Sequence, residues 1–384
     1  MKIKFKRTEL ASSIAPLMAT AVNRSTVPAV EGILIEAREP DTCIFTTYDL
    51  EKGIRTRVEA QVEEEGFNVV NAQKFFQTLQ VLDGDEIEMI IDEKLGVIIT
   101  DGKSKFRMNA LRGEDFPAVP SLKSQMGFFI EQATLLRMFR KISYAMGTVD
   151  QRQVLNGCFV QVEDEEILMV ACDSFKLAKC SRSMPIKAGN PEDRYIRYAF
   201  ILPVKTVNEL CRMLSDDEDS ITRIYIMRKH IVFEIGEYVF FSRLIEGEYI
   251  DYDRIIQTNH PTTAVLDREE MLGALERASL ITEEKIAGSM RSHVKLEFET
   301  GALKISAVST NGSSYDEIVT EHNGDNVLIA FNNRYLMDTV RATSTEKIKI
   351  SMTSALASIN VEPVDEDENV EEIFMLLPVR MREQ

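Results

Sequence analysis

The stretch "FIEQATLLRMFRKISYAMG" at residues 129–147 decides the fold, because its pattern occurs three times in the chain. A short apolar strand end leads into apolar residues spaced as on one face of a helix. The pattern also stands at residues 4–22, "KFKRTELASSIAPLMATAV", and at residues 265–283, "VLDREEMLGALERASLITE". The corresponding apolar positions are Phe5, Leu10 and Ile14, then Ile130, Leu135 and Phe139, then Leu266, Met271 and Leu275.

A second amphipathic helix pattern follows at a matching depth in each repeat and runs into an alternating strand. Its copies occupy residues 71–91, 202–226 and 331–352. The first helices recur at residues 10, 135 and 271, so each repeat has the size of a domain rather than of a solenoid unit. We therefore predict three copies of one domain, at residues 1–122, 126–256 and 262–384.

The segments between the helices alternate polar and apolar residues, as in "RIYIM", "HIVFEI" and "LKISAV". Such a period of two is typical of antiparallel strands with one buried face. The sequence predicts an α+β fold in which each domain packs two helices on antiparallel sheets.

The ends of the repeats also correspond. "SKFRMNALRGEDFP" (104–117) aligns with "YVFFSRLIEGEYIDY" (238–252), so that Phe106 matches Phe240. The apolar ending "FMLLPVRMREQ" (374–384) occupies the same place in the third repeat, where most chains end in polar residues. The simplest interpretation is a terminal strand that completes the third sheet, with one side free to border a cleft.

Composition restricts the class of protein. No run of eighteen apolar residues occurs and the N-terminus is charged, so we expect a soluble, cytoplasmic protein. The five cysteines lack a C-x-x-C spacing, which favours buried reduced thiols over disulfides or a zinc site. The net charge of -17 argues, taken alone, against nucleic acid as a partner.

The charge is unevenly distributed. The six predicted helices carry +4 in total, which leaves -21 on the rest of the chain. These helices are expected at residues 8–24, 72–82, 134–146, 203–214, 267–281 and 332–342. In the third helix, Arg137, Arg140, Lys141 and Tyr144 share the face opposite the apolar stripe. A solvated face is the ordinary explanation, but its recurrence favours a basic surface that attracts a phosphate backbone.

Catalytic patterns are missing from the sequence. The four histidines are scattered, and no nucleotide-binding glycine loop or nucleophile elbow occurs. Acidic runs at residues 163–166 and 365–368 fall between predicted strands, where solvated turns explain them. We expect no enzyme, no metal and no cofactor, and favour a binding or scaffold role.

Seven stretches, in order along the chain, resemble the bacterial DNA polymerase III beta subunit family of sliding clamps. They are "NRSTVPAVEGILIEA" (23–37), "AQKFF" (72–76), "DQRQVLNG" (150–157), "ACDSFKLA" (171–178), "LIEGEYIDYDRII" (244–256), "FNNRYLMD" (331–338) and "LLPVRM" (376–381). The resemblance implies a head-to-tail homodimer that closes a ring of clamp domains around duplex DNA. It also implies a processivity factor for DNA replication, which tethers the replicative polymerase, the clamp loader and repair proteins through short apolar peptides.

The resemblance assigns residues to three surfaces. The DNA-facing set is Arg24, Lys74, Arg137, Arg140, Lys141, Lys205, Arg212, Arg334 and Arg341. The apolar dimer contact is Phe106, Leu280 and Ile281, although Phe106 could equally be ordinary core. The peptide groove is Arg152, Leu155, Cys172, Ser174, Phe175, Lys176, Leu177, Ile250, Arg254, Ile255, Asn332, Tyr335, Leu356, Met375, Leu377, Pro378, Val379 and Arg380.

The chain departs from the family pattern at several positions. "CDSFKLA" stands where many members read TDGHRLA, and Ile250 stands where proline is frequent. Ile286 replaces an expected aromatic residue, and Val149 replaces a polar one. An apolar groove with an altered peptide preference is therefore expected. Two alternatives stay open at this point: a three-domain adaptor that does not encircle DNA, and an enzyme whose site is assembled from distant loops.

Overall fold

The computed structural model describes the chain except residues 121, 123, 125, 191, 193, 194, 283–292, 311, 365, 366 and 382–384. Its contacts divide the chain into two compact units. The first unit contains residues 1–134, 187–194 and 212–244, and the second contains residues 135–186, 195–211 and 245–384.

The first unit is built on one hydrogen-bonded series of antiparallel strands, in the order β14-β10-β16-β17-β18-β4-β3-β2-β6-β9-β8-β7-β1-β5. These strands are β1 (Lys2–Lys6), β2 (Gly32–Arg38), β3 (Thr42–Tyr48), β4 (Lys52–Glu59), β5 (Gln61–Glu64), β6 (Gly66–Asn71), β7 (Glu86–Ile91), β8 (Gly96–Thr100), β9 (Lys105–Arg112), β10 (Gly127–Glu131), β14 (Lys187–Ala188), β16 (Ile221–Ile226), β17 (His230–Ile235) and β18 (Tyr238–Arg243).

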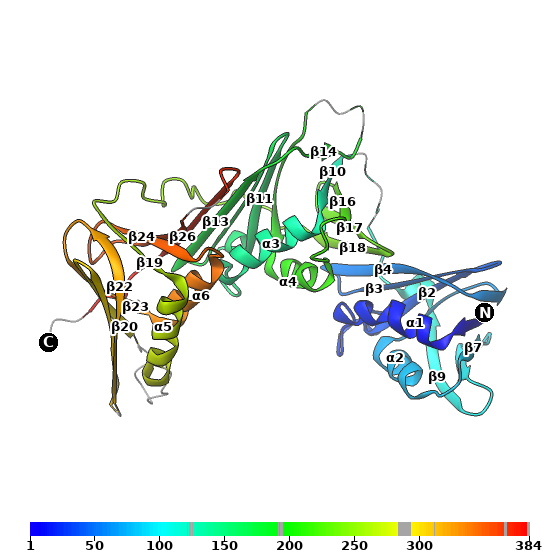
Figure 1. Ribbon diagram of the computed structural model, residues 1–384. Coiled ribbons are helices and arrows are strands. Elements are labelled where there is room, and N and C mark those ends of the chain that lie inside the picture. The colour runs from blue at the N-terminus through cyan, green and yellow to red at the C-terminus, as the bar shows by residue number, and fades with distance from the viewer. Residues whose placement is uncertain are drawn as a thin grey trace. The chain divides into compact units, whose positions relative to one another are not determined.

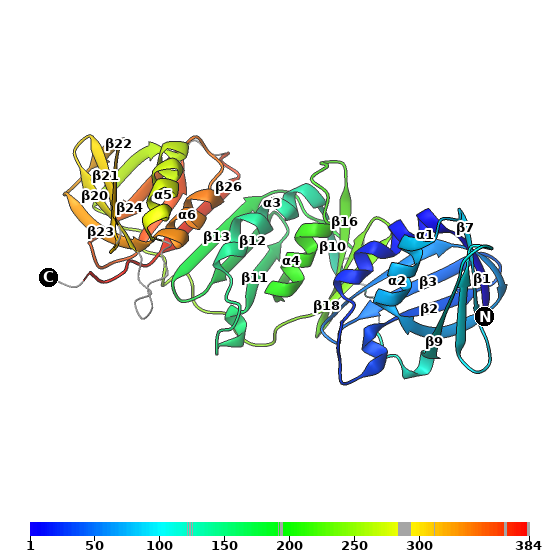
Figure 2. The ribbon, with the colours of Figure 1, turned by 90° about the horizontal axis from the view of Figure 1, so that it is seen from below.

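Two helices of the first unit, α1 (Arg7–Ile14) and α2 (Ala72–Val81), lie next to each other on one face of β2, β3 and β4 (Figures 1 and 2). The ring of Phe45 on β3 lies 5.8 Å from that of Phe5 and 6.3 Å from that of Phe75, measured between centroids. All three rings are buried. Phe75 thus anchors α2, and Leu10 and Ile14 are the buried residues of α1, so both helices bury the apolar stripe that the sequence places on them.

The second unit is built on another antiparallel series, in the order β15-β11-β12-β13-β26-β25-β24-β19-β22-β21-β20-β23. These strands are β11 (Gly157–Glu163), β12 (Glu166–Cys172), β13 (Lys176–Ser183), β15 (Arg197–Pro203), β19 (Thr262–Asp267), β20 (His293–Glu299), β21 (Ala302–Val308), β22 (Ser313–Asn323), β23 (Val327–Asn332), β24 (Lys347–Met352), β25 (Ile359–Pro363) and β26 (Val370–Leu376).

Four helices belong mostly to the second unit: α3 (Gln132–Ile142), α4 (Val204–Met213), α5 (Arg268–Thr282) and α6 (Asn333–Ala342). Figure 2 shows α3 and α4 side by side across β11, β12 and β13. Helices α5 and α6 are tied by the buried side chain of Asn333, whose Nδ2 donates to the carbonyl of Leu275 at 3.0 Å.

The predicted α+β fold with repeated pairs of helices on antiparallel sheets is confirmed. All nine apolar positions of the repeated openings are buried. Five of the six predicted helices match to within four residues at each end. The limits of the three domains stay predictions.

The predicted helix at 8–24 is too long. Helix α1 ends at Ile14 and a short 3-10 helix (Ala15–Ala19) follows. Pro16 lacks the N–H that an α-helical hydrogen bond needs, so the helix cannot continue regularly through it. Arg24 consequently lies in the loop beyond this segment, not on a helix.

Four of the five cysteines are buried, Cys211 is partly exposed, and none of the five forms a disulfide. Burial raises the pKa of the Cys158 thiol to about 12, which keeps it protonated and unreactive at neutral pH. In the described part of the chain, no helix is both long and apolar enough for a membrane crossing.

Candidate functional site

A buried apolar cluster lies where β13 and β26 pair in the second unit. Leu177 on β13 stands directly opposite Met375 on β26. Leu155, from the short 3-10 helix before β11, completes the centre of the cluster, and all three side chains are buried. The other buried members are Leu168, Val170, Cys172 and Ile256.

Four of the predicted groove residues are exposed apolar side chains. Phe175 is 56% exposed, Leu377 is 41% exposed and Leu356 is 78% exposed. Ile255, one residue before the buried Ile256, is also exposed. Isolated exposed apolar residues are common, but Phe175, Ile255 and Leu377 all lie within two residues of members of one buried cluster, which is typical of a binding surface.

The tail that leaves β26 is held by backbone hydrogen bonds on both sides. The N–H of Leu377 donates to the carbonyl of Phe175 at 2.9 Å, and the N–H of Val379 donates to the carbonyl of Ala330 at 2.7 Å. Pro378 and Val379 are partly buried, whereas Arg380 is exposed. β26 therefore lies between β13 and β25, while the tail after it is held by single backbone hydrogen bonds and presents Leu377 and Arg380 at the surface.

Lys176 is a buried cation beneath the candidate site. Its Nζ donates to the carbonyl of Tyr144 at 2.8 Å and pairs with Asp173 Oδ2 at 3.1 Å. It also lies 4.4 Å from the centroid of the Tyr335 ring, a favourable cation–π geometry. The ring of Phe175 also packs against the Tyr335 ring, with centroids 6.1 Å apart. Lys176 therefore positions Tyr335 and Phe175 instead of presenting its charge to solvent.

A polar edge is formed by Arg152, Ser174 and Asp150. Arg152 Nη2 donates to Ser174 Oγ at 2.5 Å, and its Nε donates to Asp150 Oδ1 at 3.4 Å. The backbone N–H of Arg152 also donates to that carboxylate, and these hydrogen bonds hold the pKa of Asp150 below its usual range. Arg152 is thus an oriented, exposed cation at the edge of the apolar surface.

Three further predicted members have local roles. Asn332 is the N-cap of α6, because its Oδ1 accepts from the N–H of Tyr335 at 3.2 Å. Arg254 is exposed and pairs with Asp251 at 2.9 Å. Ile250 packs, partly buried, against the cluster.

Several cluster residues were not predicted from the sequence. They are Leu168, Val170 and Ile256, with Val154, Phe159, Tyr249, Tyr252 and Ile373 packed at the edge. The rings of Phe159 and Tyr249 stack with centroids 5.5 Å apart. The continuous apolar run of β12 was a signal that this strand is buried on both faces.

The basic residues predicted to face DNA are exposed, with one exception. Arg24, Lys74, Arg137, Arg140, Lys205, Arg212, Arg334 and Arg341 are exposed. Arg341 pairs with Glu276 at 2.9 Å. Lys141 is the exception: its side chain is only 17% exposed and its Nζ contacts Glu372 and, at 3.1 Å, Ser344 Oγ.

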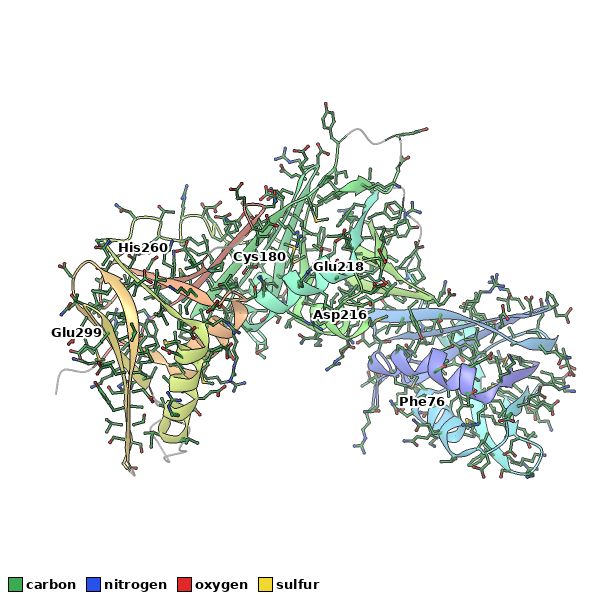
Figure 3. The ribbon with its side chains drawn as sticks, viewed as in Figure 1. Phe76, Cys180, Asp216, Glu218, His260 and Glu299 are labelled. Atoms are coloured by element: carbon green, nitrogen blue, oxygen red, sulfur yellow. The ribbon has the colours of Figure 1, made fainter. Side chains whose placement is uncertain are left out.

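Glu372 is itself buried on β26. Cys180, labelled on β13 in Figure 3, donates from its thiol to Glu372 Oε1 at 3.7 Å. Burial raises the pKa of Glu372, although the neighbouring Lys141 ammonium opposes that shift. The predicted DNA-facing Lys141 is therefore engaged within the protein.

The predicted dimer residues are only partly covered by the chain itself. Leu280 is 76% exposed, while Phe106 and Ile281 are partly buried. Ile286 lies outside the described residues. Among the residues that the structure describes, no three His, Cys, Asp or Glu side chains gather as a metal site.

Three repeats of paired helices on antiparallel sheets define a protein of the DNA-clamp fold, and comparisons with known proteins agree. Family models of the DNA polymerase III beta subunit match residues 1–120 (N-terminal domain), 129–251 (central domain) and 253–378 (C-terminal domain). The chain belongs to the DNA polymerase III beta subunit family.

Relatives named beta sliding clamp match along their whole length. Those of Proteus mirabilis and Escherichia coli K12 are each 29% identical over 384 residues, covering 99% of this chain and 100% of the relative. The DNA polymerase sliding clamp of Bacillus subtilis superposes with a TM-score of 0.90 at 27% identity, covering 100% of both chains. A Pseudomonas aeruginosa clamp bound to griselimycin superposes at 0.87 with 28% identity, covering 99% of this chain and 100% of the other.

Proposed function

We propose that this chain is a DNA polymerase processivity factor, a beta sliding clamp that closes a ring around duplex DNA as a head-to-tail homodimer. It has no catalytic role, and partners attach through short apolar peptides. The observation that carries the proposal is a pair of sheet edges that pair with no further strand within the described part of the chain.

The repeat joins its domains by one recurring strand pairing. At the first junction β18 pairs with β4, and Phe240 stands opposite Ile54. At the second junction β26 pairs with β13, and Phe374 stands opposite Ala178. Phe106, Phe240 and Phe374 are spaced 134 residues apart, so β9, β18 and β26 are equivalent strands. Likewise β4, β13 and β22 occupy equivalent places.

By the same rule β9 and β22 should pair with each other, but they do not pair within one chain. Residues 105–109 of β9 pair only with β8, and residues 313–319 of β22 pair only with β21, within the described part of the chain. Phe240 and Phe374 are fully buried, whereas Phe106 is only partly buried. The missing cover is what a β22 strand of a second copy would supply.

The register of the two junctions can be extended to this contact. It places Phe106 opposite Ser314 of the second copy. Lys103 would then stand opposite Glu317, an attractive charge pair, whereas Asp316 already pairs with Arg277 of its own chain at 2.7 Å. Such a contact joins two different surfaces, and two of them close a ring of two chains.

The exposed basic residues suit the inside of such a ring. Contacts between Lys or Arg and phosphates are independent of sequence and weaken with salt. Modest helix charge on an acidic protein attracts a duplex without gripping it, which permits sliding while ring closure prevents escape. We assign this role to Arg24, Lys74, Arg137, Arg140, Lys205, Arg212, Arg334 and Arg341, but not to Lys141.

We assign the peptide groove to the apolar surface around Leu177, Met375, Phe175 and Leu377. An apolar peptide would bury exposed side chains there, while Arg152 and Arg380 offer charged donors to its backbone and polar groups. The Pseudomonas aeruginosa clamp was solved with griselimycin, and this compound is a suitable probe for the site.

The test is topological retention on DNA. The protein is loaded on nicked circular DNA with a clamp loader and ATP, isolated at raised salt, and the DNA is then linearised. We expect release only on linearisation, because a closed ring can slide off a free end. Equal retention on circular and linear DNA would indicate ordinary binding. Failure on both, with a loader that loads a known clamp, would favour an adaptor that does not encircle DNA.

A further inference from the structure

The two junctions of the chain share the same turn in atomic detail. In the first, the N–H of Lys52 donates to Asp49 Oδ1 at 2.7 Å and the two side chains pair at 2.9 Å. In the second, the N–H of Lys176 donates to Asp173 Oδ1 at 2.9 Å and the side chains pair at 3.1 Å. The residue after each aspartate is left-handed, with φ of 76° and 78°. The positions around these turns can therefore be compared one by one.

The first difference lies in the cross-strand pair beneath each turn. At the second junction it is Leu177 opposite Met375, and at the first it is Gly53 opposite Phe241. A Cβ at Gly53 would stand 2.3 Å from Cζ of Phe241, so the phenyl ring fills the space over the glycine. Phe241 is fully buried and packs on the Tyr48 ring, with centroids 5.4 Å apart.

The second difference lies at the surface above that pair. The N–H of Leu377 donates to the carbonyl of Phe175 at 2.9 Å, and the equivalent N–H of Arg243 donates to the carbonyl of Glu51 at 2.8 Å. The backbone is thus the same, but two exposed apolar side chains at the second junction are replaced by two exposed charged ones at the first. Charged side chains resist desolvation by an apolar ligand.

We propose that these two cross-strand pairs decide which junction takes a peptide. Phe241 acts as a built-in ligand that closes the first junction, and Glu51 with Arg243 keeps its surface polar. At the second junction Leu177 and Met375 form a buried apolar floor, and Phe175 with Leu377 keep the surface above it apolar, so that it can take an apolar peptide. This inference rests on the proposed peptide groove and explains why a repeated chain offers one such site.

The test gives the first junction the apolar residue types of the second. The variant combines Glu51→Phe, Phe241→Met and Arg243→Leu. Gly53 is kept, because a Cβ there would also stand 2.5 Å from the backbone oxygen of Thr47. Isothermal titration with griselimycin is expected to give one molecule per wild-type chain and two per variant chain.

The reverse variant closes the second junction without a change of net charge. Phe175→Glu with Leu377→Arg is expected to weaken griselimycin binding about a hundredfold, since two large apolar contacts are lost. The matched control is Ile221→Glu with Val81→Arg, which makes the same chemical change at apolar residues that are 59% and 64% exposed. The control is expected to bind as the wild type does.

The outcomes separate the inference from the function on which it rests. A wild-type chain that binds no griselimycin counts against the proposed groove. A wild-type chain that binds one, with a folded forward variant that also binds one, overturns the inference. Unchanged griselimycin affinity of the reverse variant overturns the inference too. This result can be obtained even if the forward variant does not fold. Thermal unfolding establishes folding in every case.

Discussion

At the residue scale, the pair formed by Lys141 and Glu372 connects α3 to β26 inside the second unit. The Glu372 side chain is 1% exposed, and its Oε2 has no hydrogen-bond partner among the described residues. A buried ion pair contributes little net stability, but removal of one partner leaves the other charge buried and uncompensated. Lys141 is therefore more important to the fold than to the capture of phosphates.

We predict that Lys141→Met lowers the free energy of unfolding by roughly 3 kcal/mol at neutral pH. Burial already raises the pKa of Glu372 above its usual value of 4.5, and loss of the ammonium raises it further. A folded state that binds this proton more tightly than the unfolded chain gains stability as the pH falls through that window. The deficit of the variant should therefore shrink between pH 7.5 and pH 5.

Urea denaturation followed by tyrosine fluorescence measures this effect, as the chain has no tryptophan. Arg140→Met is the matched control on the same helix, because Arg140 is exposed and its loss should change stability by less than about 0.5 kcal/mol. A deficit that is the same at both pH values would mean that Glu372 does not titrate in this range.

At the element scale, α2 and α6 begin with the same kind of N-cap. Asn71 and Asn332 are N-caps whose side chains accept from the N–H three residues later. This matters for the candidate site, because α6 carries Tyr335, the ring that packs against Phe175 and Lys176. The cap thus fixes the start of the helix that supports one side of the apolar surface.

We predict that Asn332→Ala lowers the free energy of unfolding by about 1 kcal/mol, whereas Asn332→Asp retains the cap. Griselimycin affinity should fall in the alanine variant and be preserved in the aspartate variant, because an aspartate still accepts from the N–H of Tyr335. Asn71→Ala is the control: it should cost similar stability in the first unit but leave the affinity unchanged. Full affinity of Asn332→Ala would mean that the position of Tyr335 does not matter for binding.

The elements themselves were largely readable from the sequence, because periodic apolar residues report which face is buried. The repeated openings and the two helices per domain followed from that pattern alone. The end of α1 did not, since the apolar period continues past Pro16 although the missing N–H of that proline stops the α-helix. The inward position of Lys141 was also missed, because an amphipathic face gives no information about a buried acid such as Glu372, 231 residues away along the chain.

Similar reasoning applies to the candidate site. The apolar tail and the resemblance identified Leu177, Met375 and Leu377. The structural roles of Lys176 and Asn332 depend on contacts with Tyr144 and Tyr335, which no local pattern encodes. Leu168 and Val170 were missed because a two-faced apolar strand looks like ordinary core.

At the scale of the whole molecule, the edges of β9 and β22, which pair with no further strand among the described residues, make a direct prediction. Phe106→Arg should convert the proposed dimer to a monomer, because it places a charge where the equivalent Phe240 and Phe374 are fully buried. Sedimentation velocity measures the mass of the assembly. Phe67→Arg is the control, a phenylalanine on β6 that is 42% exposed. A dimer that survives Phe106→Arg would exclude this contact as the interface.

Retention on circular DNA gives the matching functional result. A Phe106→Arg monomer should dissociate from circular DNA at every salt concentration at which the wild type is retained. Its affinity for griselimycin should stay unchanged, because β9 and the apolar surface belong to different units. Loss of both properties together would point to a general folding defect.

The two open edges have a further consequence in the terms of polymer chemistry. A chain with complementary ends behaves as a monomer of the A–B type, which either cyclises or grows into a linear filament. Once two copies have joined, the second contact is intramolecular, and its effective concentration exceeds that of any third copy in dilute solution. Cyclisation therefore consumes both edges and leaves none for growth. A substitution that alters the angle at one junction would favour linear growth over cyclisation. Open filaments would then replace rings as the protein concentration rises.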